Sequence, residues 1–448
     1  MKAQKTNGFN RRQFIKSSLG TILAAAVAPQ FIPSRLLASS TAPSNKIQLG
    51  HIGVGGQGTR VLNNFLNVQE SVSLAICDPF QQRRDATGQL ITKRTNGAVQ
   101  PKMYNDFREL LADPSLDAVV IATPDHWHVP IGLAAVRANK DVYIEKPLGK
   151  SLNQNRAMLE ACRKSGRIFQ YGTFQRSMAI LHRGIELILN GYIGDLQRIE
   201  VWAPHGISGG SLVEIPVPVG LDYDLYLGPA PLKPCTKDRI TNRGSYFCSD
   251  YALGFIAGWG AHPLDIAIWG MDFDTKGLVK FNGKGQCPTP QGLFDTYSTW
   301  DVDIDFAGGV KMRFMSDDVA APVIKASGGR FVPDGTKFYG SKGWISLSRE
   351  DYDASDPQWF KQKQYDADKR VLSIPNYYGA FVNSVRDRSP SMSPIEDAVR
   401  SDAISHLSLM SIISGKEVVW NPKEYRIESP SELNQQMDVS IRGNWSQT

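Results

Sequence analysis

Three glycines in the segment GVGGQG have the spacing of a loop that binds phosphate groups. Gly53, Gly55 and Gly58 form the pattern G-x-G-x-x-G, between the apolar run KIQLGHI and the helical pattern TRVLNNFLNV. The first glycine permits a tight turn, the second lets a pyrophosphate approach the backbone, and the third lets the helix pack on the strand. The amide groups at the start of the helix then favour an anion. We therefore predict a dinucleotide site at this loop, which also contains Gly56 and Gln57.

An aspartate at the end of the second apolar run, VSLAICD, fits the ribose end of the same nucleotide. Asp78 comes twenty residues after Gly58, where a carboxylate accepts hydrogen bonds from the adenosine ribose. Its negative charge would repel a 2′-phosphate, so the sequence favours NAD as the cofactor. Arg83 and Arg84, a few residues further on, would neutralise such a phosphate, so NADP stays an alternative.

A lysine in the segment YIEKP is the candidate for chemistry on the bound nucleotide. Lys146 follows the apolar run DVYI, and ligands of open parallel sheets bind at the carboxyl ends of the strands. An amine at this edge would face the cofactor. A solvated lysine at a strand end is the alternative, and position alone does not decide between the two.

Apolar runs and amphipathic helical patterns alternate over the first part of the chain. Five runs, beginning with KIQLGHI and ending with RIFQYGTF, are separated by helical patterns. This alternation predicts a parallel sheet with right-handed crossovers. We therefore predict a doubly wound, Rossmann-type dinucleotide-binding domain over residues 47–175.

From about residue 176 the pattern changes to longer strands and few helices. Segments such as LQRIEVWAP and DVDIDFAGGVKMRF have an alternating character that favours antiparallel strands. We predict a second α/β domain over residues 176–448, with an open, mostly antiparallel sheet that forms one wall of a substrate cleft. One long helix is expected at about 394–414, packing back on the rest of the chain.

Five motifs together resemble the Gfo/Idh/MocA family of NAD(P)-dependent sugar and cyclitol oxidoreductases. They are GVGGQG, ICDP, ATPDHWH, EKP and WGAHPLDIA. The resemblance extends from about Ile47 to the C-terminal helix, and EKP after a glycine fingerprint is a specific signature. It implies a Rossmann domain, a second α/β domain with an open sheet, and a small-molecule sugar, glycoside or cyclitol as substrate.

The same resemblance assigns roles to residues outside the glycine loop. It places three residues beside the cofactor: Thr123, Pro124 and His128. It places three more at or near the junction of nicotinamide and substrate: Glu145, Lys146 and Gln175. His262 stands where the family has its catalytic histidine, and Asp265 matches a supporting acid.

Oxidation of a secondary alcohol fits these residue types. The reaction removes a proton from oxygen while hydride leaves carbon, so a base must lie within hydrogen-bond reach of the hydroxyl. We expect His262 to be that base, and Lys146 to orient the hydroxyl and stabilise negative charge on its oxygen. Without the family motif, a histidine in AGWGAHPLDI would be interpreted as a core residue.

The chain departs from the family pattern at position 258. Many members carry an aspartate four residues before the histidine, where this chain has Gly258. Either Lys146 and His262 suffice for catalysis, or another acid makes the contact that the aspartate would make. Three candidates follow from the sequence, with nothing to choose among them: Asp222, Asp224 and Asp250.

Five further residues lie in segments expected near the cleft, where aromatic faces suit the apolar side of a sugar ring. They are Trp202, His205, Tyr223, Arg243 and Trp259. Residues of this kind more often belong to the core or the rim than to a ligand site. The seven histidines and five cysteines lack metal-binding spacings, so no metal is predicted.

The N-terminus resembles a twin-arginine export signal. Arg11 and Arg12 in NRRQFIKSS precede the apolar run LGTILAAAVAP, which is about half as long as a bilayer-spanning helix. We predict a signal peptide over residues 1–33, a linker over 34–46, and a periplasmic location reached through the twin-arginine translocation machinery.

The rest of the chain is close to electrical neutrality. Six of the 50 basic residues precede Ser39 with no acid among them, which leaves 44 basic and 44 acidic residues. A neutral protein lacks the electrostatic footprint of nucleic-acid binding, so no DNA or RNA partner is expected. The open sheet face and the family analogy lead us to expect a homodimer or homotetramer.

Two functions compete on these grounds. The first is an exported oxidoreductase that holds NAD(P) tightly, because the periplasm offers no nucleotide pool for exchange. The alternative is a glycoside hydrolase with catalytic NAD, which oxidises C3, eliminates the C1 substituent and returns the hydride. Such hydrolases lack the EKP lysine in their family pattern, so Lys146 favours plain oxidoreduction. A glycan-binding protein stabilised by the cofactor is a third interpretation, but it has no need of Lys146 and His262.

Overall fold

The computed structural model describes residues 45–271, 277–288, 292–328, 330–362, 370–371, 376–443 and 445. Residues Lys46–Thr448 form one compact unit. The predicted signal peptide, and the predicted linker as far as residue 44, lie outside the described residues. Within the described part of the chain, no helix combines the length and the apolar character needed to cross a bilayer.

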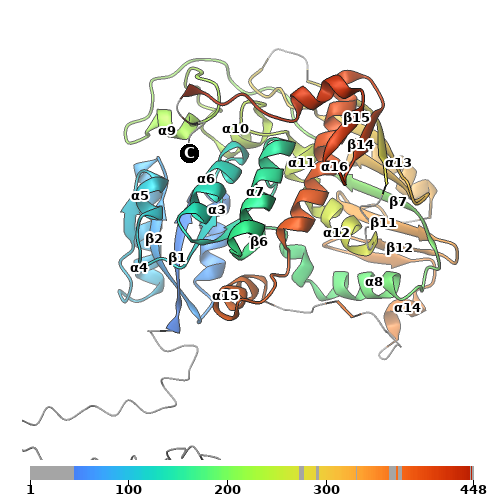
Figure 1. The fold of residues 1–448 in the computed structure, drawn as a ribbon, viewed down its shortest axis with the longest axis horizontal. Helices are drawn as coiled ribbons and strands as arrows, with labels where there is room; N and C mark the ends of the chain where they lie inside the picture. Colours follow the sequence, from blue (N-terminus) through green and yellow to red (C-terminus); the bar gives the residue numbers. More distant parts are fainter. Residues whose placement is uncertain are drawn as a thin grey trace, which may run out of the picture. The chain divides into compact units, whose positions relative to one another are not determined.

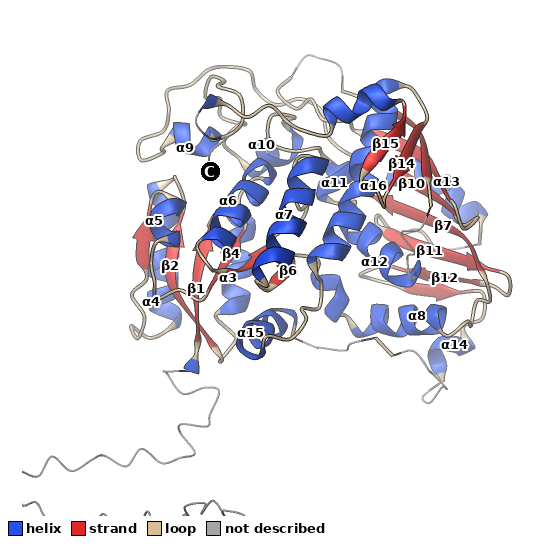
Figure 2. Ribbon diagram, in the orientation of Figure 1, coloured by secondary structure: helices blue, strands red, loops and turns tan. Residues whose placement is uncertain are grey.

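The first half of the compact unit is built on a six-stranded parallel sheet (Figures 1 and 2). Its strands are β1 (Ile47–Ile52), β2 (Ser71–Cys77), β3 (Lys102–Tyr104), β4 (Ala118–Ile121), β5 (Asp141–Ile144) and β6 (Phe169–Tyr171). The order is β3-β2-β1-β4-β5-β6, and every neighbouring pair is parallel. The order reverses direction between β1 and β4, which is the switch point where ligands bind in doubly wound sheets. The predicted Rossmann-type sheet is confirmed.

Helices cover both faces of this sheet. They are α3 (Gly56–Phe65), α4 (Gln81–Arg94), α5 (Phe107–Leu111), α6 (Asp125–Arg137), α7 (Leu152–Ser165) and, from the distant C-terminal part, α15 (Tyr377–Asp387). The central strand β4, with the sequence AVVI, is apolar throughout because both of its faces are buried. In β4, Val119 packs with α6 and α7, while Val120 packs with α3 and α15 on the opposite face.

The second half contains a nine-stranded mixed sheet with the order β13-β12-β11-β7-β10-β9-β8-β14-β15. The bounds are β7 (Leu196–Ala203), β8 (Val279–Gln286), β9 (Thr299–Phe306), β10 (Lys311–Ser316), β11 (Gly335–Gly340), β12 (Trp344–Leu347), β13 (Tyr352–Ala354), β14 (Val418–Asn421) and β15 (Arg426–Ser429). Only β7 and β10 pair in parallel; the other seven pairs are antiparallel. The predicted α/β fold with a mostly antiparallel second sheet is confirmed.

Helices of the second half lie against this sheet and along its border with the first. They are η2 (Phe174–Ser177), α8 (Ala179–Leu189), α9 (Tyr223–Leu227), α10 (Asn242–Phe247), α11 (Phe255–Gly258), α12 (Ala261–Met271), α13 (Asp317–Ala326), α14 (Gln358–Lys361), α16 (Ile395–Ser414) and η3 (Ser431–Gln436). The long helix α16 contacts α7 and β6 of the first half as well as α12 and β8 of the second (Figure 1). Its first turns pack into the hydrophobic cluster of the first half, and its later turns pack into that of the second half.

A segment of the second half closes over the carboxyl edge of the first sheet. Gln81 N donates to Gly220 O at 2.8 Å, and Asp222 N donates to Pro79 O at 2.9 Å. These bonds fasten the chain before α9 to the turn that follows β2. The segment carrying α9 and α10 is thereby held beside the switch point.

Candidate active site

One cavity at the switch point collects most of the residues expected to bind the cofactor. Ten of them line it: Gly53, Gly55, Gly56, Gln57, Asp78, Thr123, Pro124, His128, Glu145 and Lys146. The opposite wall comes from the second half and was not foreseen: Tyr226, Ile240, Thr241, Asn242, Ser245 and Tyr246. Two expected residues, Gly58 and Gln175, do not line it. The cavity thus lies between the glycine loop and the segment that carries α9 and α10.

The glycine loop has the geometry that phosphate binding needs. Gly53 has φ +82°, and a Cβ there would lie 2.7 Å from the carbonyl oxygen of Ala122. A Cβ on Gly58 would overlap the carbonyl oxygen of Gly53, so this glycine allows α3 to pack on β1. Gly55 is the N-cap of α3, and no side chain of the described residues caps the helix there. The first amide groups of α3 are therefore free of side-chain competition for an anion.

Asp78 is positioned by backbone amides at the edge of the cavity. Its Oδ2 accepts from Val54 N at 3.0 Å, and its Oδ1 accepts from Phe80 N at 2.9 Å. Burial raises the pKa of Asp78, while Arg83, 3.9 Å away, opposes that rise. Arg83 lines the cavity, whereas Arg84 donates to the Asp78 carbonyl oxygen and to Asn105. The carboxylate keeps lone pairs for ribose hydroxyls, as NAD requires.

His128 and Glu145 support the strand ends on either side of Lys146. The His128 ring places Nδ1 2.7 Å from Pro147 O and Nε2 2.9 Å from Thr123 O. Glu145 accepts from the Tyr143 hydroxyl at 3.1 Å, and burial raises its pKa. These contacts join the ends of β4 and β5 and hold Lys146 at the rim of the cavity.

Lys146 connects the cofactor cavity to the helices of the second half. Its Nζ donates to the carbonyl oxygen of Gly258 at 2.7 Å and lies 5.7 Å from the centre of the Tyr246 ring. Burial lowers the pKa of Lys146, while the charges of Glu145 and Asp125 oppose that shift. Gly258 ends α11, one helical turn before His262. The amine therefore lies between the nucleotide cavity and the histidine-bearing helix.

His262 is buried near the start of α12 with an unused ring nitrogen. Its side chain is 5% exposed, and Nδ1 has no partner among the described residues. The imidazole packs edge-on against Trp259 and Phe174, with ring centres 5.7 and 6.0 Å apart. Burial lowers the pKa of His262 well below its usual value, and the positive charges of Arg349 and Lys146 lower it further. The ring is therefore neutral at ordinary pH and free to accept a proton.

Arg349 belongs to this cluster although no sequence motif pointed to it. The guanidinium lies over the rings of Trp259 and Phe174, at 4.6 and 5.0 Å from their centres. Gln175 connects it to the histidine: its amide nitrogen donates to His262 O at 3.0 Å, and its amide oxygen accepts from Arg349 Nε at 2.6 Å. Arg349 follows β12, so only tertiary folding brings it to His262.

Asp265 has a partner of its own. Its two oxygens accept from Arg176 Nε and Nη2 at 2.8 and 2.6 Å, and Arg176 Nη1 also binds Asp397 at 2.8 Å. This buried pair connects α12 to α16. Asp265 acts on the site by anchoring the helix that carries His262, and both of its oxygens are already engaged.

The three acids considered as substitutes for the missing aspartate are committed elsewhere. Asp222 caps α9 and accepts from Asn105. Asp224 pairs with Arg442 at 2.6 Å, and Asp250 pairs with Arg239 at 2.7 Å. None of the three lines the cofactor cavity. Besides Asp78 and Glu145, a third acid lines it with Lys146: Asp125, which sequence reasoning missed although it stands in ATPDHWH.

The five residues suggested for substrate contact have different surroundings. Trp202 is fully buried and donates from Nε1 to Val332 O at 2.7 Å, so it belongs to the core of the second half. Tyr223 donates its hydroxyl to the backbone of the segment after α9, and Arg243 is exposed on α10. Trp259 packs on His262. Of the five, Trp259 is the residue that touches the candidate catalytic histidine.

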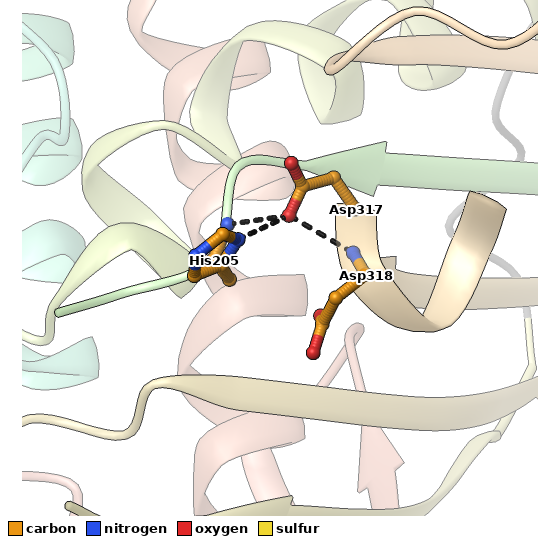
Figure 3. Close-up of side chains that lie close together, drawn as sticks. All are labelled: His205, Asp317 and Asp318. Atoms are coloured by element: carbon orange, nitrogen blue, oxygen red, sulfur yellow. Dashed lines mark hydrogen bonds and ion pairs between the residues drawn. The ribbon is translucent and has the colours of Figure 1, made fainter.

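His205 lies in a separate acidic cluster (Figure 3). Its Nδ1 and backbone N are 2.7 and 2.9 Å from Asp317 Oδ1, which also accepts from Asp318 N at 2.9 Å. The three side chains have potential metal-ligand atoms within 4.8 Å of one another, an arrangement that sequence spacing did not suggest. Asp317 begins α13, so its hydrogen bonds order the start of that helix.

Comparison with known families agrees with this architecture. Residues 47–173 match the model of the oxidoreductase family with an NAD-binding Rossmann fold, and residues 201–337 match that family's C-terminal alpha/beta domain. Together the two matches span more than half of the chain. The chain belongs to the Gfo/Idh/MocA family. Its first half is an NAD-binding domain, and the cavity described above has the loop geometry and the acid that this cofactor needs.

Individual relatives include both hydrolases and dehydrogenases. An alpha-N-acetylgalactosaminidase of Tannerella forsythia is 23% identical over 92% of this chain and 96% of its own length. A glycosyl hydrolase family 109 protein of Shewanella amazonensis is 29% identical, but the match covers only 33% of this chain and 35% of that protein. Scyllo-inositol dehydrogenase from Lactobacillus casei, solved with NAD(H) and scyllo-inositol, is 17% identical with a TM-score of 0.56, covering 84% and 99% of the two chains. The last likeness shows the shared fold.

Proposed function

We propose that this Gfo/Idh/MocA protein is an exported oxidoreductase that transfers hydride between tightly held NAD and a secondary hydroxyl of a sugar, glycoside or cyclitol. The observation that carries the proposal is the position of Lys146. Its Nζ lies at the rim of the nucleotide cavity and binds the carbonyl oxygen one helical turn before His262. An amine and a neutral imidazole at this junction are the groups that alcohol oxidation requires.

The residues divide the chemistry between them. NAD, when bound, supplies the acceptor for the hydride. His262, kept neutral by burial, accepts the proton of the substrate hydroxyl. Lys146 donates a hydrogen bond to the same oxygen and stabilises the negative charge that develops on it. Trp259 and Phe174 shield the imidazole from water and fix its plane.

Export supports tight retention of the cofactor. The leader resembles one that serves a route for folded cargo, so the protein would acquire NAD in the cytoplasm before translocation. Because the periplasm supplies no free nucleotide, the hydride must be returned on the enzyme, to a second substrate or in a later step of the same reaction. The binding cavity, walled by both halves of the fold, suits a cofactor that is not exchanged.

The second candidate is an NAD-dependent glycoside hydrolase. Similarity to the Tannerella forsythia alpha-N-acetylgalactosaminidase over nearly the whole chain favours it. In that reaction, transient oxidation at C3 acidifies the C2 proton, the C1 substituent is eliminated, and hydride returns to C3. The reaction needs a base for the C2 proton in addition to the group at the C3 hydroxyl, whereas simple oxidoreduction needs only the Lys146–His262 site.

Incubation of the purified exported protein with glycosides, without added NAD, separates the two functions. Under the leading proposal each enzyme molecule yields one equivalent of keto-sugar and of bound NADH, and a second sugar then reoxidises the cofactor. Release of free aglycone over many turnovers, with no net NADH, would instead establish the hydrolase. A protein that carries no nucleotide after purification would contradict tight retention.

Lys146→Met tests the residue on which the proposal rests. Methionine is nearly the same size but has no charge, so hydride transfer should fall by at least about a thousandfold, the range of a lost catalytic group. The bound nucleotide, measured by its absorbance after denaturation, should be retained at the wild-type level. Activity within tenfold of wild type would show that Lys146 has no catalytic role.

A further inference from the structure

Asp125 is a buried carboxyl group inside the cofactor cavity. It is the first residue of α6, its side chain is 4% exposed, and it lines the same cavity as Lys146. Its Oδ2 is buried without a hydrogen-bond partner among the described residues. An ionised carboxylate is costly to bury in this way, so the position needs an explanation.

Two other buried acids, one on each half of the fold, already have hydrogen-bond partners. Asp402 accepts from the Tyr171 hydroxyl at 2.6 Å and from Leu148 N at 2.7 Å. Asp78 accepts from two backbone amides. A role in holding the fold explains Asp402, and a role in binding the nucleotide explains Asp78. Neither explains Asp125, which lines the cavity and whose Oδ2 has no hydrogen-bond partner among the described residues.

Burial favours the protonated form of Asp125, and nearby positive charges oppose it. Burial raises its pKa to about 8; Lys146 and Lys150 favour the ionised form, and Asp402 opposes it. Tyr171 and Tyr246 are the other titratable groups that interact with it. His262, by contrast, has a pKa held well below its usual value. A proton taken from the substrate is therefore held poorly by His262 and well by Asp125.

At position 258, where the family resemblance implied an aspartate, the backbone of this chain contacts Lys146. The carbonyl oxygen of Gly258 occupies one N–H of Lys146. A Cβ at this position would lie 3.7 Å from the nearest heavy atom, so a side chain could begin there without a clash. Apart from the adjacent Glu145, the acid whose charge acts most on Lys146 is Asp125, at the start of α6.

We propose that Asp125 is the proton acceptor that works with Lys146, holding the substrate proton inside the protein while the hydride is on the cofactor. This rests on the proposed oxidoreductase function. In the oxidation half, the substrate O–H bond breaks and its proton enters the His262–Lys146 pair. Lys146 releases one of its own N–H protons to the Asp125 carboxylate, and hydride passes from the carbinol carbon to NAD⁺. The products are a ketone, NADH and a neutral Asp125. When the hydride is returned to a substrate, each of these transfers is reversed.

Asp125→Asn, with a rescue variant, tests the catalytic part. The isosteric amide cannot take a proton, so the single-turnover rate should fall about a hundredfold and its pH dependence above pH 6 should flatten. Adding Gly258→Asp should restore at least tenfold of that loss, because it places a carboxylate next to Lys146. Asp224→Asn, the same change at an exposed acid, is the matched control and should leave rate and pH profile unaltered.

Nucleotide binding gives a second readout that does not depend on turnover. The ring of NAD⁺ carries a positive charge that NADH lacks, so NAD⁺ should favour ionised Asp125. In nucleotide-free wild-type protein, the NAD⁺/NADH affinity ratio, measured by calorimetry, should rise by up to about tenfold per pH unit between pH 6 and 8. In Asp125→Asn that ratio should be independent of pH.

Failure of the inference about Asp125 can be distinguished from failure of the proposed oxidoreductase function. If the wild type transfers hydride while Asp125→Asn keeps its rate and pH profile, the inference about Asp125 is wrong and the proposed function stands. If no sugar is oxidised but the affinity ratio depends on pH through Asp125, the proton site is real and the proposed reaction is wrong. A pH-independent affinity ratio in the wild type overturns the inference in either case.

Discussion

Burial decides the properties of the residues around the proposed reaction centre. Desolvation lowers the pKa of Lys146 and of His262 and raises the pKa of Asp125. Each shift favours the uncharged form, as expected for groups removed from water. The site therefore brings together three titratable groups that burial biases towards their uncharged forms. That property suits the proposed function, in which the hydride and the proton are returned on the enzyme.

Arg349→Gln should make His262 more basic. The guanidinium is a positive charge that lowers the pKa of His262, so its removal raises that pKa. Because the protonated imidazole cannot act as a base, activity is lost below the pKa, and the acid limb of the pH–rate profile should move to higher pH. The glutamine keeps a polar group for Gln175.

Arg313→Gln provides the control for this measurement. It removes an arginine that pairs with Asp301 on β10, outside the cluster around His262. Its acid limb should coincide with that of the wild type. An acid limb that is unchanged or shifted to lower pH in Arg349→Gln would contradict the electrostatic role of Arg349.

At the scale of elements, α12 is positioned by a buried charge pair. Asp265 on α12 binds Arg176, which follows Gln175 and also binds Asp397 on α16. Gln175 in turn donates to the backbone of His262. The helix that carries the histidine, the turn after β6 and the long helix α16 are thereby fixed to one another, and the imidazole is fixed with them.

Asp265→Asn should destabilise the fold more than Asp397→Asn. Removing one partner of a buried pair leaves an incompletely compensated charge, at a cost of about 3–5 kcal/mol in the free energy of unfolding. Asp397 is partly exposed, and its loss leaves the Asp265–Arg176 pair intact, so its cost should be about 1 kcal/mol. Urea unfolding of the two variants measures the difference. Equal losses would show that the pair does not anchor α12.

At the scale of the whole molecule, the predicted leader and the cofactor site are related through the proposed function. Under the proposed function, a site that does not exchange nucleotide would have to be loaded with NAD before export. The predicted oligomer was based on the open sheet face of the second half, and strands β9 and β10 of that sheet carry charged pairs such as Arg313–Asp301 and Lys311–Asp305. Interface cores are usually poor in charge. The homodimer or homotetramer therefore stays a prediction.

Conversion of Arg11 and Arg12 to lysine should block export while leaving the folded protein intact. The twin-arginine route depends on the arginine pair, so cell fractionation should find the variant in the cytoplasm with NAD bound. Arg35→Lys, a conservative change in the predicted linker, should leave the periplasmic fraction unchanged. Periplasmic recovery of the double variant at the wild-type level would show that the leader works by another route.

Local spacing was enough to predict the nucleotide half of this protein. Gly53, Gly58 and Asp78 act through the turn, the helix and the strand in which they stand, so their sequence separation carries their function. Lys146 belongs with them, because the end of a parallel strand lies at the ligand edge of the sheet whatever the rest of the chain does. The fold class also followed from local patterns, since the period of apolar residues sets the type of each element.

The tertiary structure decided which polar groups share the site with Lys146. Trp202 and Arg349 stand in segments of similar sequence character, yet one is enclosed in the core and the other lies against Trp259. Three acids were candidates from the sequence but have partners outside the cavity: Asp222, Asp224 and Asp250. Asp125 lines the cavity, and its buried Oδ2 has no hydrogen-bond partner among the described residues. Burial and unused hydrogen-bonding capacity depend on neighbours more than a hundred residues away, and no local pattern encodes them.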